Sequence, residues 1–345
     1  MKLFSAIAIL TAVVGTTGLF VNKTEVLLNS EVFRKYSETI TPSLYDLIWR
    51  GSVFSALAYC TKHNRISLGP LPEACPCTLC TDTPDIVEVS IIYAGTVSGV
   101  VFRDDTTREI VVGLKGTTTN TEWAMDFNII PVPYHSLNKR PKGLKKWYKQ
   151  NKECKGCTIH KGFYSGAKEI HDKTFDKVIA LAKKYPDYKI MVTGHSLGGA
   201  LAPLIANEYL KMGLHTTLIT FGSPKIGNPL FAKWMDDIWN THDHYSDLDG
   251  IHSTSSFIRV SHKDDFVPLV PTRQMGYKHC GVDVFFTTPD LPMDITNIKL
   301  RNSPSQLSVN EEEDEVELIF SNTTYSDYQK SMDSHRNYLL RMNQC

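Results

Sequence analysis

The sequence has no excess of charge of either sign. Its 345 residues include 37 lysines and arginines and 37 aspartates and glutamates, so the formal net charge is zero. This balance argues against nucleic acid or another general polyanion as a partner, because such binding needs a basic surface. A local basic stretch at residues 139–155 is expected to be a solvated loop or helix face. The alternative is that this stretch assists docking on anionic lipid.

Internal repeats are absent, and only one apolar run is long. Residues 3–20 are almost wholly apolar, follow Met1 and Lys2, and end among small residues. The pattern predicts a secretory signal over residues 1–20, and therefore a protein that is secreted or lumenal. The alternative is an uncleaved membrane anchor, because about 18 apolar residues just span a bilayer. No later run is long enough to span one.

The cysteine count is even, which agrees with an oxidising compartment and disulfides. The eight cysteines are Cys60, Cys75, Cys77, Cys80, Cys154, Cys157, Cys280 and Cys345. A zinc site built from the two C-x-x-C pairs is the alternative, but more than 70 residues separate the pairs. No metal or other cofactor is expected. Two sequons predict glycans at Asn22 and Asn322.

Strand and helix patterns alternate along much of the chain, whose 42% apolar and 21% charged residues are typical of a globular protein. A strand is expected at residues 86–93, a hairpin at 97–103 and 109–114, and later strands before Ser196, at 217–221 and at 257–261. Helices are expected at 45–59, 164–184 and 197–212. This order predicts one α/β domain over residues 21–345, with functional residues at the carboxyl ends of parallel strands. Residues 302–317 are expected to form a solvated acidic loop.

A G-x-S-x-G pentapeptide at residues 194–198 lies between a strand pattern and a helix pattern. Its two glycines lack the Cβ atoms that would collide in a sharp turn, so the hydroxyl of Ser196 is expected to stand exposed. Ser196 is therefore the candidate nucleophile. The alternative is a glycine-rich turn ahead of a packed helix. His195 is expected to be a packing residue that points away from Ser196.

A nucleophilic serine needs a base and a carboxylate that orients the base. In this type of fold the acid and then the histidine follow the serine along the chain. Asp264 and Asp265 both follow an apolar strand, and Asp265 is preferred because a rigid Val-Pro turn comes after it. His335 is the preferred base, in a loop before a final helix. The other histidines after Ser196 are His215, His242, His244, His252, His262 and His279, of which the last two are expected to be packing residues.

Five segments of the chain follow one another in an informative order. They are KGTTTNTEWAMD at 115–126, HKGF at 160–163, GHSLGGA at 194–200, TFGSPKIGN at 220–228 and HKDDFVP at 262–268. In this order they resemble the fungal class 3 lipase family, over about residues 50–345. The resemblance implies an α/β-hydrolase fold: a mostly parallel central sheet with helices on both faces, an antiparallel N-terminal hairpin and a short helical lid. It also implies a catalytic triad of Ser196, Asp265 and His335.

The same resemblance implies further parts of the site. The backbone amides of Thr117 and Leu197 would form the oxyanion hole. Residues 119–130 would form the lid, in which Trp123, Met125 and Phe127 supply an apolar face that turns toward a lipid surface when the lid opens. The alternative is that these three side chains are ordinary core.

Disulfides are also implied by the resemblance, which pairs Cys60 with Cys345 and Cys154 with Cys157. Two of Cys75, Cys77 and Cys80 are expected to join each other, which leaves the third for Cys280.

The chain departs from the family pattern at two positions near the site. Lys115 stands where the family usually has Arg, and it lacks the planar fork of a guanidinium group. Asp264 stands where the family usually has Gly, and like-charge repulsion beside Asp265 is expected to raise the pKa of either acid. Neither change removes a residue of the implied triad.

These features predict a secreted, cofactor-free carboxylic ester hydrolase, and first a triacylglycerol lipase. The expected partner is a lipid ester at an oil–water or membrane interface, and the expected state is a monomer. Phospholipase A1 and a feruloyl or short-chain esterase are alternatives within the class. A lipid-binding homologue that kept the fold and lost turnover is the rival from another class.

Overall fold

The computed structural model describes most of the chain between residues 40 and 343. The described ranges are 40–64, 67–75, 77–81, 86–94, 97–117, 130–138, 154–301 and 325–343. Several predicted features lie outside these ranges: the signal at 1–20, the sequons at Asn22 and Asn322, the lid residues Trp123, Met125 and Phe127, the acidic loop at 302–317, and Cys345. Among the described helices, none has both the length and the apolar character needed to cross a membrane.

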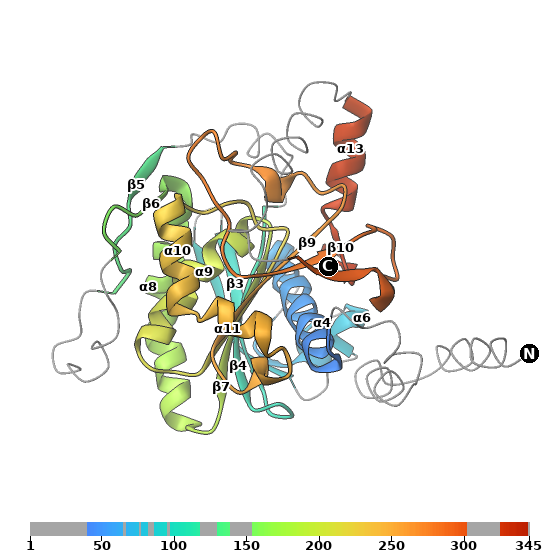
Figure 1. The fold of residues 1–345 in the computed structure, drawn as a ribbon. Coiled ribbons are helices and arrows are strands. Elements are labelled where there is room, and N and C mark those ends of the chain that lie inside the picture. The colour runs from blue at the N-terminus through green and yellow to red at the C-terminus, as the bar shows by residue number, and fades with distance from the viewer. Residues whose placement is uncertain are drawn as a thin grey trace, which may run out of the picture.

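A nine-stranded mixed sheet lies at the centre of the molecule (Figure 1). Five neighbouring strands, β4, β7, β8, β9 and β10, run parallel, whereas β1 to β4 at one side and β10 to β11 at the other pair antiparallel. The strands, in their order across the sheet, are β1 (Gly69–Pro70), β2 (Ile86–Ala94), β3 (Val97–Asp104), β4 (Glu109–Leu114), β7 (Lys189–His195), β8 (Thr216–Phe221), β9 (Ser256–His262), β10 (Val282–Phe286) and β11 (Ile298–Arg301). The expected hairpin and the largely parallel α/β sheet are confirmed.

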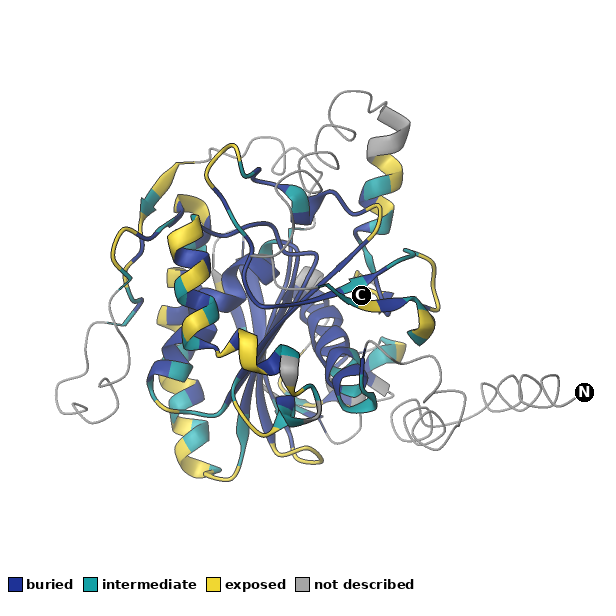
Figure 2. Cartoon of the chain, viewed as in Figure 1, coloured by how far each residue is buried: buried dark blue, intermediate teal, exposed yellow. Residues whose placement is uncertain are grey.

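Helices cover both faces of this sheet, as predicted (Figure 1). One face carries α4 (Pro42–Leu57), followed by the 3-10 helix η1 (Ala58–Asn64), and the other carries α8 (Lys161–Lys184), α9 (Leu197–Lys211) and α10 (Pro229–Ile238). Alternation along β4 explains the two layers, because Val111 packs with the α4 face whereas Ile110 and Val112 pack with the α8 and α9 face. Figure 2 shows the strands and most of α4 as buried, and the outer sides of α8 and α10 as exposed.

Smaller elements complete the described structure. They are the helices α5 (Leu71–Ala74), α6 (Thr78–Thr81), α11 (Thr241–Ser246) and α13 (Tyr325–Ser334), the 3-10 helices η3 (Asp249–His252), η4 (Val267–Leu269) and η5 (Ile295–Asn297), and the strand pairs β5 (Pro131–Pro133) with β6 (Thr158–His160) and β12 (Asn337–Tyr338) with β13 (Leu340–Arg341).

The C-terminal segment corrects one expectation. The sequence predicts His335 before a final helix, but it directly follows α13, and the hairpin of β12 and β13 comes after it. Leu339 at the turn of this hairpin has φ 62°, in the left-handed region. Because the chain reverses there, Tyr338 and Leu340 pair with each other and a helix cannot form.

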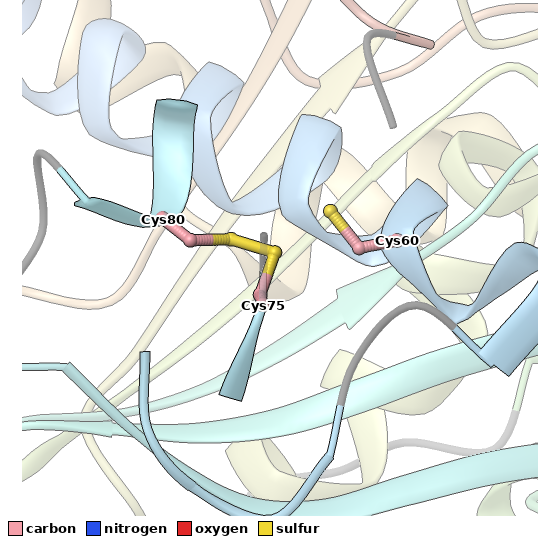
Figure 3. Close-up of side chains that lie close together, drawn as sticks. All are labelled: Cys60, Cys75 and Cys80. Carbon is pink, nitrogen blue, oxygen red and sulfur yellow. A yellow bond between two sulfur atoms is a disulfide. The ribbon is translucent and has the colours of Figure 1, made fainter. Parts of the chain in front are cut away.

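The described cysteines mostly pair as expected. Disulfides join Cys75 to Cys80 and Cys154 to Cys157. The sulfur of Cys60, which is also disulfide-bonded, lies within 4.8 Å of those of Cys75 and Cys80, and all three residues are buried (Figure 3). Zinc bound by the two C-x-x-C pairs does not fit, because three of those four sulfurs are oxidised.

The expected link between the remaining cysteine of the 75–80 loop and Cys280 is wrong. Cys77 and Cys280 are both free thiols, the first half-buried and the second buried. Burial, its largest cause, raises the pKa of the Cys280 thiol well above its usual value, so this sulfur stays protonated and unreactive.

Candidate active site

Ser196 lies in a sharp turn between β7 and α9. Its backbone has φ 58° and ψ −125°, a conformation that a non-glycine residue rarely adopts. A Cβ atom on Gly194 would lie 2.5 Å from the carbonyl group of Gly198, and one on Gly198 would lie 2.3 Å from the carbonyl oxygen of Leu114. Only glycine fits at these two positions, so the predicted reason for the G-x-S-x-G pattern holds in the structure.

Ser196 is more enclosed than expected, because only 3% of its surface is exposed. One wall is the segment after β4, where a Cβ atom on Gly116 would lie 2.9 Å from the Cβ of Ser196. The turn is held from the other side by the backbone amide of Ser196, which donates to the carbonyl oxygen of Phe221 over 2.9 Å. The serine therefore lies at the carboxyl ends of β4, β7 and β8.

Asp265 and His335, 70 residues apart in the chain, meet in a direct hydrogen bond. Nδ1 of His335 donates to Oδ2 of Asp265 over 2.8 Å, and both side chains are buried. The other oxygen of Asp265 accepts from the amide of Val267 over 2.9 Å, at the start of η4. The turn that begins at Val267 therefore orients Asp265 inward, as its Val-Pro sequence predicts.

The Nδ1 bond leaves Nε2 of His335 as the basic nitrogen of the ring, because a neutral imidazole carries one proton. This nitrogen is buried and has no hydrogen-bond partner among the described residues. A buried polar atom without a partner is unusual, and here it is the atom that a proton-accepting base would use.

Gly222 brings the acid and base close to the serine turn. It follows Phe221, which holds the amide of Ser196, and it has φ 53°. A Cβ atom at Gly222 would lie 2.9 Å from both Oδ2 of Asp265 and Cε1 of His335. Glycine is required at this position both for backbone conformation and for space.

Tyr338 is a partner of Asp265 that the sequence reasoning missed. Its hydroxyl donates to Oδ2 of Asp265 over 2.5 Å. Burial first and the charge of Asp265 second raise the pKa of Tyr338 well above its usual value, so the hydroxyl stays protonated and remains a donor. The one indication of this contact in the sequence is that Tyr338 lies three residues after His335.

The electrostatics of Asp265 correct the expected effect of its neighbour. Burial alone would raise the pKa of Asp265, but the charge and hydrogen bond of His335, the charge of His262 and the Tyr338 hydroxyl together lower it. Repulsion from Asp264 does not raise this pKa, because the side chain of Asp264 is exposed to solvent. Asp264 has φ 71°, which explains why glycine would suit this position.

His195 does more than fill space beside the nucleophile. Its Nδ1 lies 2.6 Å from the hydroxyl of Tyr59, and its Nε2 lies 2.7 Å from the carbonyl oxygen of His335. A carbonyl oxygen only accepts, so Nε2 carries the proton and the Tyr59 hydroxyl donates to Nδ1. Burial, the largest cause, lowers the pKa of His195 well below its usual value and keeps this ring neutral.

The implied oxyanion donors lie beside the serine. Leu197 is the first residue of α9, where backbone N–H groups have no partner within the helix. Thr117 directly follows Gly116 and is half-buried. The hydroxyl of Tyr59 and the carbonyl oxygen of His195 would lie 2.4 Å and 2.8 Å from a Cβ atom on Gly116, so a side chain there would displace this wall.

Two other segments of the family resemblance have structural roles. Nδ1 of His160 caps α8 by accepting from the amides of Gly162 and Phe163 over 3.1 Å and 3.3 Å. The ammonium group of Lys225, which is buried, donates to the carbonyl oxygen of Leu269 over 2.8 Å and so supports the turn after Asp265.

Comparison with known proteins adds to this geometry. The family model described as lipase (class 3) matches residues 111–275. A secreted mono- and diacylglycerol lipase of Gibberella zeae is 34% identical over 188 residues, covering 53% of this chain and 44% of the relative. Lipase A of Sodiomyces alcalophilus is 32% identical over 209 residues, covering 57% of this chain and 48% of the relative. The chain therefore spans about half the length of these relatives.

A solved structure extends the likeness of fold over more of the chain. The crystal structure of Lip2 lipase from Yarrowia lipolytica matches with a TM-score of 0.67 at 23% identity, covering 88% of this chain and 95% of that one. At this identity the likeness concerns the fold, which is the predicted α/β-hydrolase fold. The family model matches the segments that carry Ser196 and Asp265, so over this range the chain is similar to class 3 lipases.

Proposed function

We propose that the protein is a serine carboxylic ester hydrolase, and specifically a lipase. The observation that carries this proposal is the buried Asp265–His335 pair with an unpartnered Nε2. The His335 ring lies 4.5 Å, centroid to centroid, from the ring of His195, the residue before the strained turn of Ser196. A serine, a histidine with one free basic nitrogen and a buried carboxylate are the groups that acyl transfer needs. The names of the relatives support lipid esters as the class of substrate.

The proposed reaction has two halves. Nε2 of His335 takes the proton of Ser196 as its hydroxyl oxygen attacks the ester carbonyl carbon, and the amides of Leu197 and Thr117 stabilise the oxyanion. His335 returns the proton to the leaving alcohol, which departs and leaves an acyl-enzyme. Water then attacks the acyl group with His335 again as base, which releases the carboxylic acid and restores Ser196. Asp265 remains ionised and stabilises the imidazolium ion that forms in each half.

The substrate and the place of action can be proposed more narrowly. We infer a triacylglycerol lipase that acts as a monomer at an oil–water or membrane interface, with residues 119–130 as its lid. The apolar side chains of Trp123, Met125 and Phe127 support this inference, because such a lid becomes lipid-facing when it opens. The described residue of this segment is its last, Ile130, which is 42% exposed.

Secretion, glycosylation and the remaining disulfide belong to the same proposal. The relative from Gibberella zeae is named as secreted, which supports the signal at residues 1–20 and a single domain from residue 21 onward. Glycans at Asn22 and Asn322 and a Cys60–Cys345 bond are then expected in the mature protein.

Replacement of Ser196 tests the reaction. Ser196→Ala should lower kcat on a soluble aryl ester by about four to six orders of magnitude while the protein remains folded. An organophosphonate probe should label the wild type and leave the variant unlabelled. Full hydrolysis by Ser196→Ala would refute the mechanism, and a wild type that binds lipid but neither labels nor turns over would be the silent homologue.

Substrate comparison tests the finer assignment. Rates on emulsified triglyceride, phospholipid and a soluble aryl ester should be measured below and above the solubility limit of each substrate. A lipase should favour triglyceride and gain rate when the emulsion forms. Preference for phospholipid would indicate phospholipase A1, and a rate confined to soluble esters would indicate an esterase.

A further inference from the structure

His262, which the proposed mechanism does not use, has an unusual environment at the end of β9. It is buried, and only 2% of its surface is exposed. Both of its ring nitrogens face backbone carbonyl oxygens: Nδ1 contacts that of Lys263, and Nε2 lies 2.7 Å from that of Ser334. Lys263 lies in the loop that carries Asp265, and Ser334 ends α13 immediately before His335.

The two contacts bear on which ring nitrogens of His262 carry a proton. A carbonyl oxygen accepts hydrogen bonds and cannot donate them, so each contact is satisfied only by a nitrogen that carries a proton. A neutral imidazole has one such nitrogen, whereas an imidazolium ion has two. The surroundings of His262 therefore fit the cation, provided that a nearby charge compensates for its burial.

The groups that face His262 supply this compensation. Asp265 interacts with it electrostatically, and the charge of His262 is one of the causes that lower the pKa of that carboxyl group. His195 on β7 is kept neutral by burial, and Tyr338, whose ring centroid lies 4.6 Å from that of His262, keeps its proton. His335 shares the same carboxylate.

Other charged groups nearby turn toward solvent. The side chains of Lys263 and Asp264 are exposed, and Asp333 on α13 is exposed and paired with Arg336. The buried Arg259 on β9 and Asp283 on β10 pair with each other over 2.8 Å, so the negative charge described as acting on His262 is the carboxylate of Asp265.

We propose that His262 is a positioning residue whose doubly protonated ring fastens the loop of Asp265 to the end of α13 and so fixes His335 against its acid. The proposal rests on the proposed hydrolase function, because it assigns His262 to the same acid and base. A neutral packing histidine would instead leave one of the two carbonyl contacts without a proton. The cation also adds a second positive charge near the imidazolium ion that His335 becomes during the proposed reaction, and like charges repel across a poorly solvated site.

A second connection between the same segments provides a matched comparison. The hydroxyl of Ser331 on α13 donates to the carbonyl oxygen of Asp264 over 2.6 Å and accepts from the amide of Phe266 over 3.1 Å. Ser331 therefore ties the same loop to the same helix without charge. Its presence also means that loss of His262 does not release the loop completely, so His262 variants are expected to fold.

The first test observes the ring directly and does not depend on activity. The protein is labelled with 15N-histidine, and one-bond and long-range 1H–15N spectra are recorded at the pH of maximal activity. Both ring nitrogens of one histidine should carry a proton, and those signals should disappear in His262→Gln. A His262 ring with a proton on only one nitrogen would overturn the proposal, even if the protein proves to be an active lipase.

The second test separates positioning from charge. On a soluble aryl ester, His262→Gln should lower kcat by about 10-fold to 100-fold with little change in KM, as expected for a misplaced catalytic base. It should also move the acid limb of the kcat/KM profile to higher pH, because the repelling cation is gone. Ser331→Ala should lower kcat without moving that limb.

A control histidine completes the design. Nε2 of His252 in η3 also lies 2.7 Å from a backbone carbonyl oxygen, that of Ser43 at the start of α4. His252→Gln should leave both the rate and the pH profile unchanged. If His262→Gln behaves like Ser331→Ala, with a lower rate and an unmoved acid limb, the charged role is refuted. If no variant and no wild type hydrolyses any ester, the proposed function fails, and the spectra still decide the state of the ring.

Discussion

The two halves of the candidate site are built in different ways. The nucleophile half is a continuous piece of chain, in which β7 leads through Ser196 into α9 and nearby glycines supply the space. The acid–base half is assembled from distant segments: Gly222 after β8, Asp265 after β9, and His335 with Tyr338 after α13. The first half depends on local backbone geometry and the second on tertiary packing, so the same kind of substitution should affect stability in one and catalysis in the other.

Gly194→Ala should have the largest effect, and the effect should be on folding. The new Cβ atom would lie 2.5 Å from backbone atoms of Gly198, and backbone cannot move aside as a side-chain tip can. We expect a loss of at least about 3 kcal/mol in the free energy of unfolding, measured by urea denaturation.

Gly166→Ala in α8 is the matched control for this prediction. Its new Cβ would meet only side-chain carbons of Leu201 and Val97, at 3.3 Å or more, and alanine is favoured over glycine within a helix by about 1 kcal/mol. Equal stability of the two variants would mean that the turn is not held by local crowding.

Gly222→Ala should affect catalysis more than stability. Its Cβ would press on Asp265 and His335 at 2.9 Å, so kcat on a soluble ester should fall by about 100-fold with KM nearly unchanged. The positive φ should add a strain of about 1–2 kcal/mol to the folded state.

Gly276→Ala separates these two effects. Gly276 has φ 84°, and a Cβ atom added there would have no neighbouring atom within 4 Å, so the alanine variant carries the strain without the contact. It should lose similar stability and retain kcat. A comparable loss of kcat in both variants would show that strain, and not displacement of the acid and base, lowers the rate.

The same contrast explains how far the sequence could predict the site. Ser196 was identifiable because its glycines and flanking patterns are adjacent in the chain. Asp265 and His335 were preferred among several acids and histidines from chain order and local pattern, and the family resemblance then pointed to the same two residues. Tyr338 and Gly222 were missed because their contacts join segments that only the fold brings together.

The wrong expectations have the same origin. The side chain of Asp264 is exposed to solvent, so its charge does not raise the pKa of Asp265. A sequence does not show which way the Asp264 side chain points. The reversed turn at Leu339 replaces the expected final helix. Leucine rarely adopts a left-handed φ, so this residue does not indicate a turn in the sequence.

Tyr338→Phe should weaken the assembled half without changing its shape. Because the folded state lowers the pKa of Asp265, the carboxylate contributes stability above its unfolded pKa of about 3.9, and that contribution is lost as the pH falls through the folded value. Removal of the hydroxyl donor should therefore cost about 1–3 kcal/mol at neutral pH and less in acid.

Urea denaturation at neutral pH and below about pH 4 measures this difference. Tyr277→Phe is the control, because the hydroxyl of Tyr277 is buried without a hydrogen-bond partner among the described residues. Tyr277→Phe should lose little free energy of unfolding, and this loss should not depend on pH. A pH-independent loss in Tyr338→Phe as well would separate the tyrosine from the ionisation of Asp265.

Tyr59→Phe should have the smallest effect, and it tests whether the two halves are coupled. The hydroxyl of Tyr59 donates to Nδ1 of His195, and Nε2 of His195 donates to the carbonyl oxygen of His335. These two hydrogen bonds connect β7, which leads into Ser196, with the residue proposed as the base. Loss of the hydroxyl should cost about 1 kcal/mol in stability and lower kcat by less than about tenfold. Because His195 is neutral, the acid limb of the pH profile should stay in place, in contrast to His262→Gln. An unchanged kcat with reduced stability would mean that the halves share packing but position their catalytic groups independently.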